Sequence, residues 1–387
     1  MLKVLNISCL CGRVKNAVAV SDPRGITPAA LCHCYGCRHT TGQLYASYCG
    51  VQLGADEVEK LLADGALTEL TVAHLRLPKD VYQHHDTILY FCSTCGCHVY
   101  RRTESTQELG ILDIASGTIS SLQDETPTNG SAALAFGPHI NANGTQDGGV
   151  AKFIGHVPGV PDARESNSLN TSQPELFVPA SCLCKGVQLH ITPPSPESFN
   201  PKSGFSDMII PFHTQDPRIS NPDDEKWWLR CDNTKYMAGL CACRSCRLSS
   251  GFELQSWAFI PRVNILQSSP EPPFSWTTLD FDALRAKGTL RSHESSPGVM
   301  REFCSLCGAT VFWHDKWRSE LIDVSVGLLD SARGGRAEGL LDWCLERVSF
   351  AEDSVLGRDG SVRDCAKALV ENVEKNMKTL SLAEVHP

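Results

Sequence analysis

The stretch Cys32-His33-Cys34-Tyr35-Gly36-Cys37 places three cysteines in six residues, with the spacing CxCxxC. The same spacing returns at Cys241-Ala242-Cys243-Arg244-Ser245-Cys246, and an arginine follows the third cysteine in both copies. Each copy lies between an upstream CxC pair and a downstream CxxC pair. This doubled cysteine frame predicts a tandem duplication whose fold is organised around bound metal.

The repeat extends beyond the cysteines and defines the domain organisation. Residues 31–42 match 240–251, and residues 90–96 match 302–308, in the same order along the chain. We predict a first domain at 1–158, a linker at 159–178, a second domain at 179–350 and a helical tail at 351–387. The second domain carries an insertion near 195–235, which lengthens the segment between its CxC pair and its CxCxxC motif.

Composition limits the class of protein. The chain has 387 residues and a formal net charge of -9, with 42% apolar and 20% charged residues. That length suits two globular domains, each able to bury its own core. The acidic balance weighs against a broad nucleic-acid or anionic-membrane surface, because both need clustered Lys and Arg.

The cysteines also indicate a cellular compartment. No stretch approaches the roughly 18 apolar residues of a membrane span, and the apolar segment in residues 1–7 is too short for a signal peptide. We therefore expect a cytoplasmic protein, with a nuclear location left open. In a reducing compartment, close CxC and CxxC pairs are metal ligands more often than disulfides.

Short apolar runs around the cysteines predict a mainly β fold. Strands are expected near 14–20, 45–48, 87–91 and 109–114, and the first CxxC falls at a hairpin tip. Residues 55–65 suit a short helix, and the apolar spacing beyond residue 350 suits a C-terminal helix.

Seven motif cysteines in each repeat suit two metal sites better than one. A site with four thiolates is closed and structural, whereas a site with three leaves a coordination position for water or substrate. Spacing alone leaves two groupings open. In one, CxC and CxxC form the closed site and CxCxxC forms the open one. In the other, the last two cysteines of CxCxxC join the CxxC pair. We prefer the first grouping, because the second leaves cysteines without partners.

The order CxC, CxCxxC-R-x-x-[ST]-G and FCxxCG resembles the glutathione-dependent formaldehyde-activating enzyme and centromere protein V family. The resemblance covers both halves apart from the linker, insertion and tail. It implies a zinc-binding β-tent fold, similar to the Rab-exchange-factor fold, in each half. The structural zinc ligands it implies are Cys9, Cys11, Cys92 and Cys95, and again Cys182, Cys184, Cys304 and Cys307. The substrate-facing, catalytic zinc ligands it implies are Cys32, Cys34 and Cys37, and again Cys241, Cys243 and Cys246.

The resemblance also implies an activity. Members are associated with carbon–sulfur lyase chemistry, the reversible addition of glutathione to formaldehyde. The expected cofactor is Zn²⁺, up to two ions per domain, and the expected partner is a small thiol or thiol adduct, with glutathione as a co-substrate. A catalytically silent, zinc-stabilised binding scaffold of the centromere protein V type is the alternative.

Other residues carry weaker signals. His33 is a candidate for supporting or replacing a ligand, although its counterpart is Ala242. Arg38 and Arg247 match each other and either steer an anionic thiol or form surface salt bridges. Trp227-Trp228 either caps a cleft or packs the insertion down. The cysteines outside the repeat are expected to be small buried side chains, and they are Cys49, Cys97, Cys231, Cys344 and Cys365.

Overall fold

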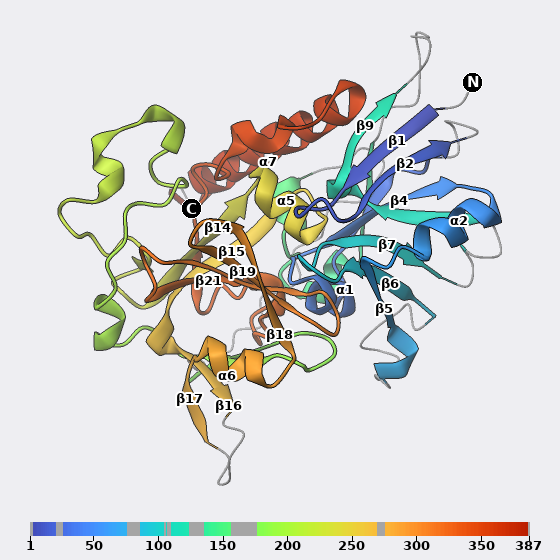
Figure 1. The fold of residues 1–387 in the computed structure, drawn as a ribbon. Helices are drawn as coiled ribbons and strands as arrows, with labels where there is room; N and C mark the ends of the chain where they lie inside the picture. Colours follow the sequence, from blue (N-terminus) through green and yellow to red (C-terminus); the bar gives the residue numbers. More distant parts are fainter. Residues whose placement is uncertain are drawn as a thin grey trace.

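The computed structural model describes residues 3–20, 26–75, 86–103, 106, 110–123, 135–155, 176–268 and 275–385. We call described residues 3–155 the first half and 176–385 the second half. Strands dominate both halves, and one long helix ends the chain (Figure 1). The predicted mainly β class with a C-terminal helix is thus confirmed. Most of the predicted linker lies outside the described residues.

The first half contains two sheets. The small sheet has the order β2 (Lys15–Val20), β1 (Lys3–Ser8) and β9 (Ile119–Gln123). The large sheet has the order β10 (Phe136–Ile140), β3 (Ala29–Cys32), β4 (Ala46–Gln52), β8 (Ile111–Ala115), β7 (His98–Arg102), β6 (Ile88–Cys92) and β5 (Leu67–Thr71). The two helices beside them that matter here are α1 (Tyr35–Thr41) and α2 (Ala55–Leu62).

The second half repeats the large sheet. Its order is β13 (Leu229–Arg230), β14 (Lys235–Cys241), β15 (Gln255–Pro261), β21 (Leu321–Ser325), β20 (Thr310–Asp315), β19 (Val299–Cys304) and β18 (Leu290–Ser296), with β22 (Leu341–Trp343) also pairing with β14. Its small sheet has the order β11 (Val178–Ser181), β12 (Gln188–Ile191), β16 (Ile265–Ser268) and β17 (Trp276–Thr278). Two short helices accompany these sheets, α5 (Arg244–Ser250) and α6 (Phe281–Ala286).

The strand pairing explains why the cysteine motifs meet. In each half the CxxC pair lies at the turn of an antiparallel hairpin, β6–β7 or β19–β20. The turn needs a left-handed residue directly after it, which Gly96 (φ 76°) and Gly308 (φ 75°) supply without a Cβ penalty. The CxC pair follows the first strand of the small sheet in each half. Both motifs are therefore loops fixed by strands of different sheets.

The insertion is packed down by its aromatic residues. Trp227 and Trp228 are buried, and their indole N–H groups donate to the carbonyls of Gly204 and Ser198 at 2.9 and 3.0 Å. Trp227 also meets the ring of Phe259 on β15 edge to face. The packing interpretation of this pair is therefore correct. Figure 1 shows the insertion along the side of the second half that lies away from the first half.

The two halves pack through contacts that occur in matched pairs. Leu10 lies between the two cysteines of the first CxC pair, and its amide donates to the carbonyl of Leu248 at 2.9 Å. In the matching arrangement the amide of Leu183 donates to the carbonyl of His39 at 2.8 Å. Leu248 belongs to α5 and His39 to α1. Each CxC loop therefore contacts the helix that follows CxCxxC in the other half.

A second pair of contacts brings the backbones of the halves together. The amide of Gly117 donates to the carbonyl of Gly251 at 2.9 Å, and that of Gly327 donates to Gly42 at 3.2 Å. A Cβ atom on Gly117 or Gly327 would collide with the opposing backbone. The four glycines thus allow an approach that larger residues would prevent.

The long helix α7 (Gly360–Val385) packs across both halves. It contacts β9 and α4 (Ala151–Ile154) of the first half. Asn372 and Asn376 both donate to the carbonyl of Ile154, at 2.6 and 2.7 Å. Val362 belongs to the core of the first half, whereas Leu369 and Val370 lie in the core cluster shared with the second. Within the described ranges, no helix is long and apolar enough to cross a membrane.

Candidate metal centres

The CxC and CxxC motifs of each half form a four-sulfur group, which we call a quartet. The first quartet is Cys9, Cys11, Cys92 and Cys95, and the second is Cys182, Cys184, Cys304 and Cys307. In each quartet all sulfurs lie within 4.8 Å of one another. Adjacent Sγ atoms are 3.5 Å apart for Cys9–Cys11 and 3.4 Å apart for Cys182–Cys184.

The CxCxxC motifs form two groups of three sulfurs, which we call triplets. The first triplet is Cys32, Cys34 and Cys37, and the second is Cys241, Cys243 and Cys246, again with all sulfurs of a group within 4.8 Å. No other described His, Cys, Asp or Glu side chain joins either triplet within that limit. The structure therefore groups CxC with CxxC and leaves CxCxxC separate, as in the grouping we preferred.

The local fold of each triplet follows from a helix start. Cys34 is the N-cap of α1, and its Sγ accepts the amide of Cys37 at 3.3 Å. Cys243 caps α5 in the same way, and its Sγ accepts the amide of Cys246 at 3.2 Å. An amide donor and the positive end of a short helix favour a thiolate at a capping cysteine. A hydrogen bond with Cys241 adds to this effect and lowers the pKa of Cys243, whereas a hydrogen bond with Cys32 outweighs it and raises the pKa of Cys34 to about 11.

The spacing of the sulfurs fits zinc. A tetrahedral zinc ion with bonds of about 2.3 Å needs sulfurs about 3.8 Å apart. Neighbouring sulfurs in the quartets are 3.4 to 3.6 Å apart, which is close to that value. No disulfide joins any of the 19 cysteines, all of which are described. The clusters could thus each hold a metal ion, with four ligands in a quartet and three in a triplet.

The cysteines within a cluster differ in pKa. Neighbouring thiols donate hydrogen bonds to Cys9, Cys184 and Cys243, which holds the pKa of each of these thiols well below its ordinary value. The donors have raised pKa values, and Cys95 and Cys307 are examples. In both quartets and in the second triplet, a metal ion that displaces the remaining protons therefore finds one sulfur already favoured as thiolate.

Neutral polar side chains surround the first triplet. The amide of Asn141 donates to Cys32 Sγ at 3.5 Å. His33 Nε2 lies 2.8 Å from His139 Nδ1, and His139 Nε2 lies 3.3 Å from the carbonyl of Gly155. That carbonyl can only accept, so His139 Nε2 carries a proton and His33 Nε2 donates to His139. Burial lowers the pKa of His33 to about 3, so the ring is neutral at pH 7.

A cation and aromatic rings surround the second triplet. Arg301 on β19 is buried, and its Nη1 lies 3.5 Å from Cys246 Sγ. Trp257, Trp313 and Phe350 pack against the same three cysteines. Phe350 occupies the position that Asn141 has in the first half. Ile140 pairs in parallel with Cys32, Ser349 pairs in parallel with Cys241, and Asn141 and Phe350 are the next residues. Both residues are left-handed, with φ of 50° and 60°.

The arginines that follow the triplets are not on the surface. Arg247 donates to the carbonyls of Gly117 and Leu356 at 2.6 and 3.0 Å, and so links the two halves. Arg38 is also buried, and its guanidinium lies beside Gly335 of the other half. The surface salt bridge that we expected for these arginines is therefore wrong. Burial in the interface keeps the Arg247 head group from steering a ligand.

Four of the five remaining cysteines behave as predicted. Cys49, Cys97 and Cys344 are buried, and Cys365 is partly buried on α7. Cys231 is exposed, which corrects our expectation, because the inserted segment carries it onto a surface turn with φ of 50°.

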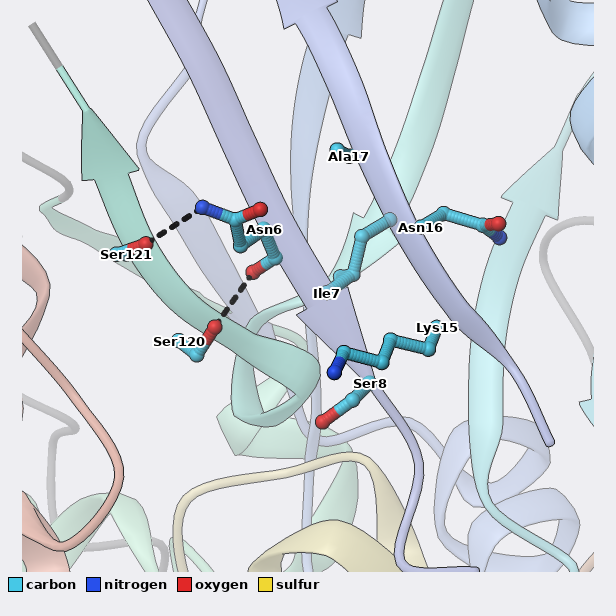
Figure 2. A pocket seen from close by; sticks show the side chains of 8 residues that line it. All are labelled: Asn6, Ile7, Ser8, Lys15, Asn16, Ala17, Ser120 and Ser121. Atoms are coloured by element: carbon cyan, nitrogen blue, oxygen red, sulfur yellow. Dashed lines mark hydrogen bonds between the residues drawn. The ribbon is translucent and has the colours of Figure 1, made fainter. Parts of the chain in front are cut away.

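The surface hollow drawn in Figure 2 lies away from all four clusters. It is formed on the small sheet of the first half by β1, β2 and β9. Asn6 donates to Ser121 Oγ at 2.8 Å, and Ser120 donates to the Asn6 carbonyl at 3.1 Å. No cysteine, histidine or carboxylate lines it. The chemistry of the chain is therefore concentrated in the clusters and not in this hollow.

Comparison with known protein families places the chain. The family model described as glutathione-dependent formaldehyde-activating enzyme matches residues 4–131 and 226–343, which together exceed half of the chain. The chain belongs to this family. The second match begins beyond Cys182 and Cys184, so the structure supplies the pairing of these two cysteines with Cys304 and Cys307. No curated protein and no solved structure showed significant similarity to the chain.

Several residues near the triplets were not found from the sequence. Asn141 and His139 lie about a hundred residues beyond the first triplet and approach it only through the parallel pairing of β10 with β3. Arg301 precedes the second CxxC by three positions, and its counterpart in the aligned repeat is Leu89. That mismatch in the repeat was the one available signal.

Proposed function

We propose that the chain is a zinc-dependent carbon–sulfur lyase-type enzyme that acts on a thiol adduct of formaldehyde or another small carbonyl compound. The observation that supports this proposal is the pairing of each closed quartet with a three-sulfur triplet. Three protein ligands leave a zinc ion one position for substrate, whereas four ligands do not. Membership of the family supports a glutathione-related role for that position.

The chemistry needs no oxidant or reductant. A thiol adds to a carbonyl carbon, a carbon–sulfur bond forms, and the thiol proton ends on the carbonyl oxygen. The reverse step breaks the same bond and returns the proton. When bound at a triplet, zinc would supply a Lewis acid and favour the thiolate of an incoming thiol.

The chain's own residues supply the setting. The amides of Cys37 and Cys246 donate to the capping sulfurs and hold each triplet in one geometry. Of the six triplet cysteines, Cys34 and Cys243 retain the largest exposed fractions, 7% and 8%. We therefore expect a ligand to approach each triplet beside its capping cysteine, at the start of α1 or α5. The other four triplet cysteines are slightly more buried, at 3 to 5% exposed.

The same burial favours the second candidate function, a catalytically silent zinc-stabilised scaffold. All six triplet cysteines are less than a tenth exposed. A triplet that admits no ligand would serve only to brace the start of its helix. The two candidates make different predictions for turnover.

The test is the exchange between free and glutathione-bound ¹³C-formaldehyde, followed by NMR with the full-length, zinc-loaded chain. We expect the double variant Cys34→Ser/Cys243→Ser to abolish the enzyme-dependent exchange. Cys231→Ser is the matched control, because this cysteine is exposed and outside the clusters. Exchange that survives the double variant, or that never exceeds the uncatalysed rate in the native protein, would favour the scaffold.

A further inference from the structure

The guanidinium of Arg301 is buried among neutral acceptors. Its Nε lies 3.3 Å from Ser295 Oγ, Nη2 lies 2.9 Å from Ser245 Oγ, and Nη1 lies 3.4 Å from Ser249 Oγ. Among the described residues, Nη1 also lies 3.5 Å from Cys246 Sγ. Among the residues that the structure describes, no carboxylate lies within ion-pair distance of this arginine. A buried cation without a carboxylate needs another anion close by.

The thiolates of the second triplet are that anion. A zinc ion held by three thiolates carries a formal charge of -1, because two positive charges meet three negative ones. Arg301 brings the second triplet and its surroundings to formal neutrality. The contact to Cys246 Sγ is a charge-assisted hydrogen bond when that sulfur is ionised.

The first triplet has no cation at the position equivalent to Arg301. Leu89 occupies the position of Arg301, and Gly36 occupies the position of Ser245, so both the cation and its hydroxyl acceptor are missing. The neutral side-chain amide of Asn141, which follows β10, donates to this triplet instead. Arg101 lies on the neighbouring strand, but Asp113 binds it at 2.8 Å. In the second half Arg318 forms a similar ion pair with Asp323 at 2.7 Å, so each half has one such arginine whose charge is neutralised by a carboxylate.

The arginines at 38 and 247 do not account for the difference. Both halves have one, and both are buried against the opposite half. Arg38 interacts with Cys34, but the carboxylates of Asp147 and Asp330 interact with Arg38 more strongly and offset its charge. Arg301 is the cation that the second half has in addition.

We infer that Arg301 makes the second triplet the site that accepts an anionic thiolate, and that the first triplet is restricted to a neutral fourth ligand or to none. The inference rests on the proposed function and assigns it to one half. A thiolate added to the first triplet would create a buried charge of -2, whereas the same ligand at the second triplet leaves -1. Arg244, exposed at the rim of the second triplet where the first half has Tyr35, adds a further cation to the entrance.

The test uses the full-length chain loaded with cobalt(II) and titrated with glutathione in the absence of any aldehyde. A thiolate that binds cobalt produces a new sulfur-to-metal charge-transfer absorption, which is a readout independent of turnover. S-methylglutathione is the ligand control, because it keeps the carboxylates and has no thiol. We expect glutathione to bind with a stoichiometry of one per chain.

Two cysteine variants locate the binding. Binding should persist in Cys34→Ser/Cys37→Ser, which disables the first triplet, and should disappear in Cys243→Ser/Cys246→Ser. Two arginine variants then separate charge from shape. Arg301→Gln keeps hydrogen-bond donors and should weaken binding by about tenfold or more, the range expected for a hydrogen bond to a charged group. Arg301→Lys should keep affinity close to that of the native chain.

Each outcome decides between the inference and the proposed function. Loss of the second-triplet metal in Arg301→Gln but not in Arg301→Lys would also support the inference, because lysine keeps the positive charge and glutamine does not. Two equivalents of glutathione per chain, or unchanged affinity in Arg301→Gln, would overturn it and leave the proposed function standing. Absence of thiol binding at both triplets in the native chain would overturn both.

Discussion

The first triplet accepts a hydrogen bond from the neutral side chain of Asn141, whereas the second contacts the buried cation Arg301. Both are N-caps of seven-residue helices, with equivalent amide-to-sulfur hydrogen bonds. His33, His139 and Asn141 approach the first, and Arg301 with three aromatic rings approaches the second. Duplication has thus kept the backbone that positions three sulfurs and changed the charge around them. Metal geometry and ligand preference are therefore separable properties of this fold.

We expect the largest effect on stability from a substitution that prevents one quartet from binding metal. We expect Cys92→Ser to remove metal from the first quartet and to destabilise the chain severely, because structural zinc contributes about 10 kcal/mol or more to the folding of small zinc domains. Since the first CxC loop binds α5 through Leu10 and Leu248, the damage should extend to the second half. Metal content and thermal melting measure the loss.

Tryptophan fluorescence emission measures directly whether Cys92→Ser disturbs the second half. All seven tryptophans lie in the second half. A red shift of their emission in Cys92→Ser would show that the halves are interlocked. Native emission together with full metal at the second quartet and second triplet would show instead that each half stands alone. Cys304→Ser is the reciprocal variant, and Cys344→Ser is a control at a buried cysteine outside the clusters.

A buried ion pair present in one half gives the next effect. Arg358 binds Glu253 through two hydrogen bonds of 2.6 and 2.9 Å, and both residues are buried. The first half has Leu44 at the position of Glu253. We expect Glu253→Leu to cost about 3–5 kcal/mol of unfolding free energy, because it leaves an unpaired buried cation. Urea unfolding measures it.

The double variant is the sharper arm of that experiment. Glu253→Leu/Arg358→Leu removes both charges, so it should be less destabilised than Glu253→Leu alone. If the double variant lost as much unfolding free energy as Glu253→Leu and Arg358→Leu lose together, the two residues would not interact.

The sequence was sufficient to predict the repeated cysteine motifs and the fold around them, but not the different surroundings of the two triplets. The tandem repeat, the hairpin position of CxxC, the insertion and the C-terminal helix all depend on local spacing and apolar pattern, which a single chain displays. The surroundings of the triplets depend on strand pairing between distant segments, as for Asn141 and Cys32. The arginines after CxCxxC were misplaced on the surface, because nothing local shows that the two halves bury them against each other.

Buried histidines predict a different pH response for the two halves. Burial lowers the pKa of His98 to about 4 from an ordinary value of 6.5, and Thr310 occupies the equivalent position. The unfolded chain therefore binds a proton that the folded chain refuses. The resulting stability is complete above pH 6.5 and is lost as the pH falls toward 4.

For His98 alone that loss amounts to about 3 kcal/mol. We expect the free energy of unfolding of His98→Gln to fall less between pH 7 and pH 4 than that of the native chain. Urea unfolding at both pH values measures the difference, and His213→Gln is the control because His213 is exposed. Parallel losses in the native chain and His98→Gln would contradict the assignment.

The smallest effect concerns a contact where the halves are not matched. Gln43 Nε2 donates to Gln255 Oε1 at 2.6 Å across the interface, but the residues at the equivalent positions are Phe252 and Ala46. Gln43→Ala should cost about 1 kcal/mol, the usual net value of a neutral hydrogen bond. Gln255 still donates to Ser325 Oγ at 3.2 Å, which limits the loss. Gln188→Ala, at an exposed position, should change the free energy of unfolding by less than half of that amount. If Gln43→Ala were as silent as this control, the matched backbone contacts at Leu10, Leu183 and the four glycines would carry the interface, and the side chains that differ between the halves would be free to diverge.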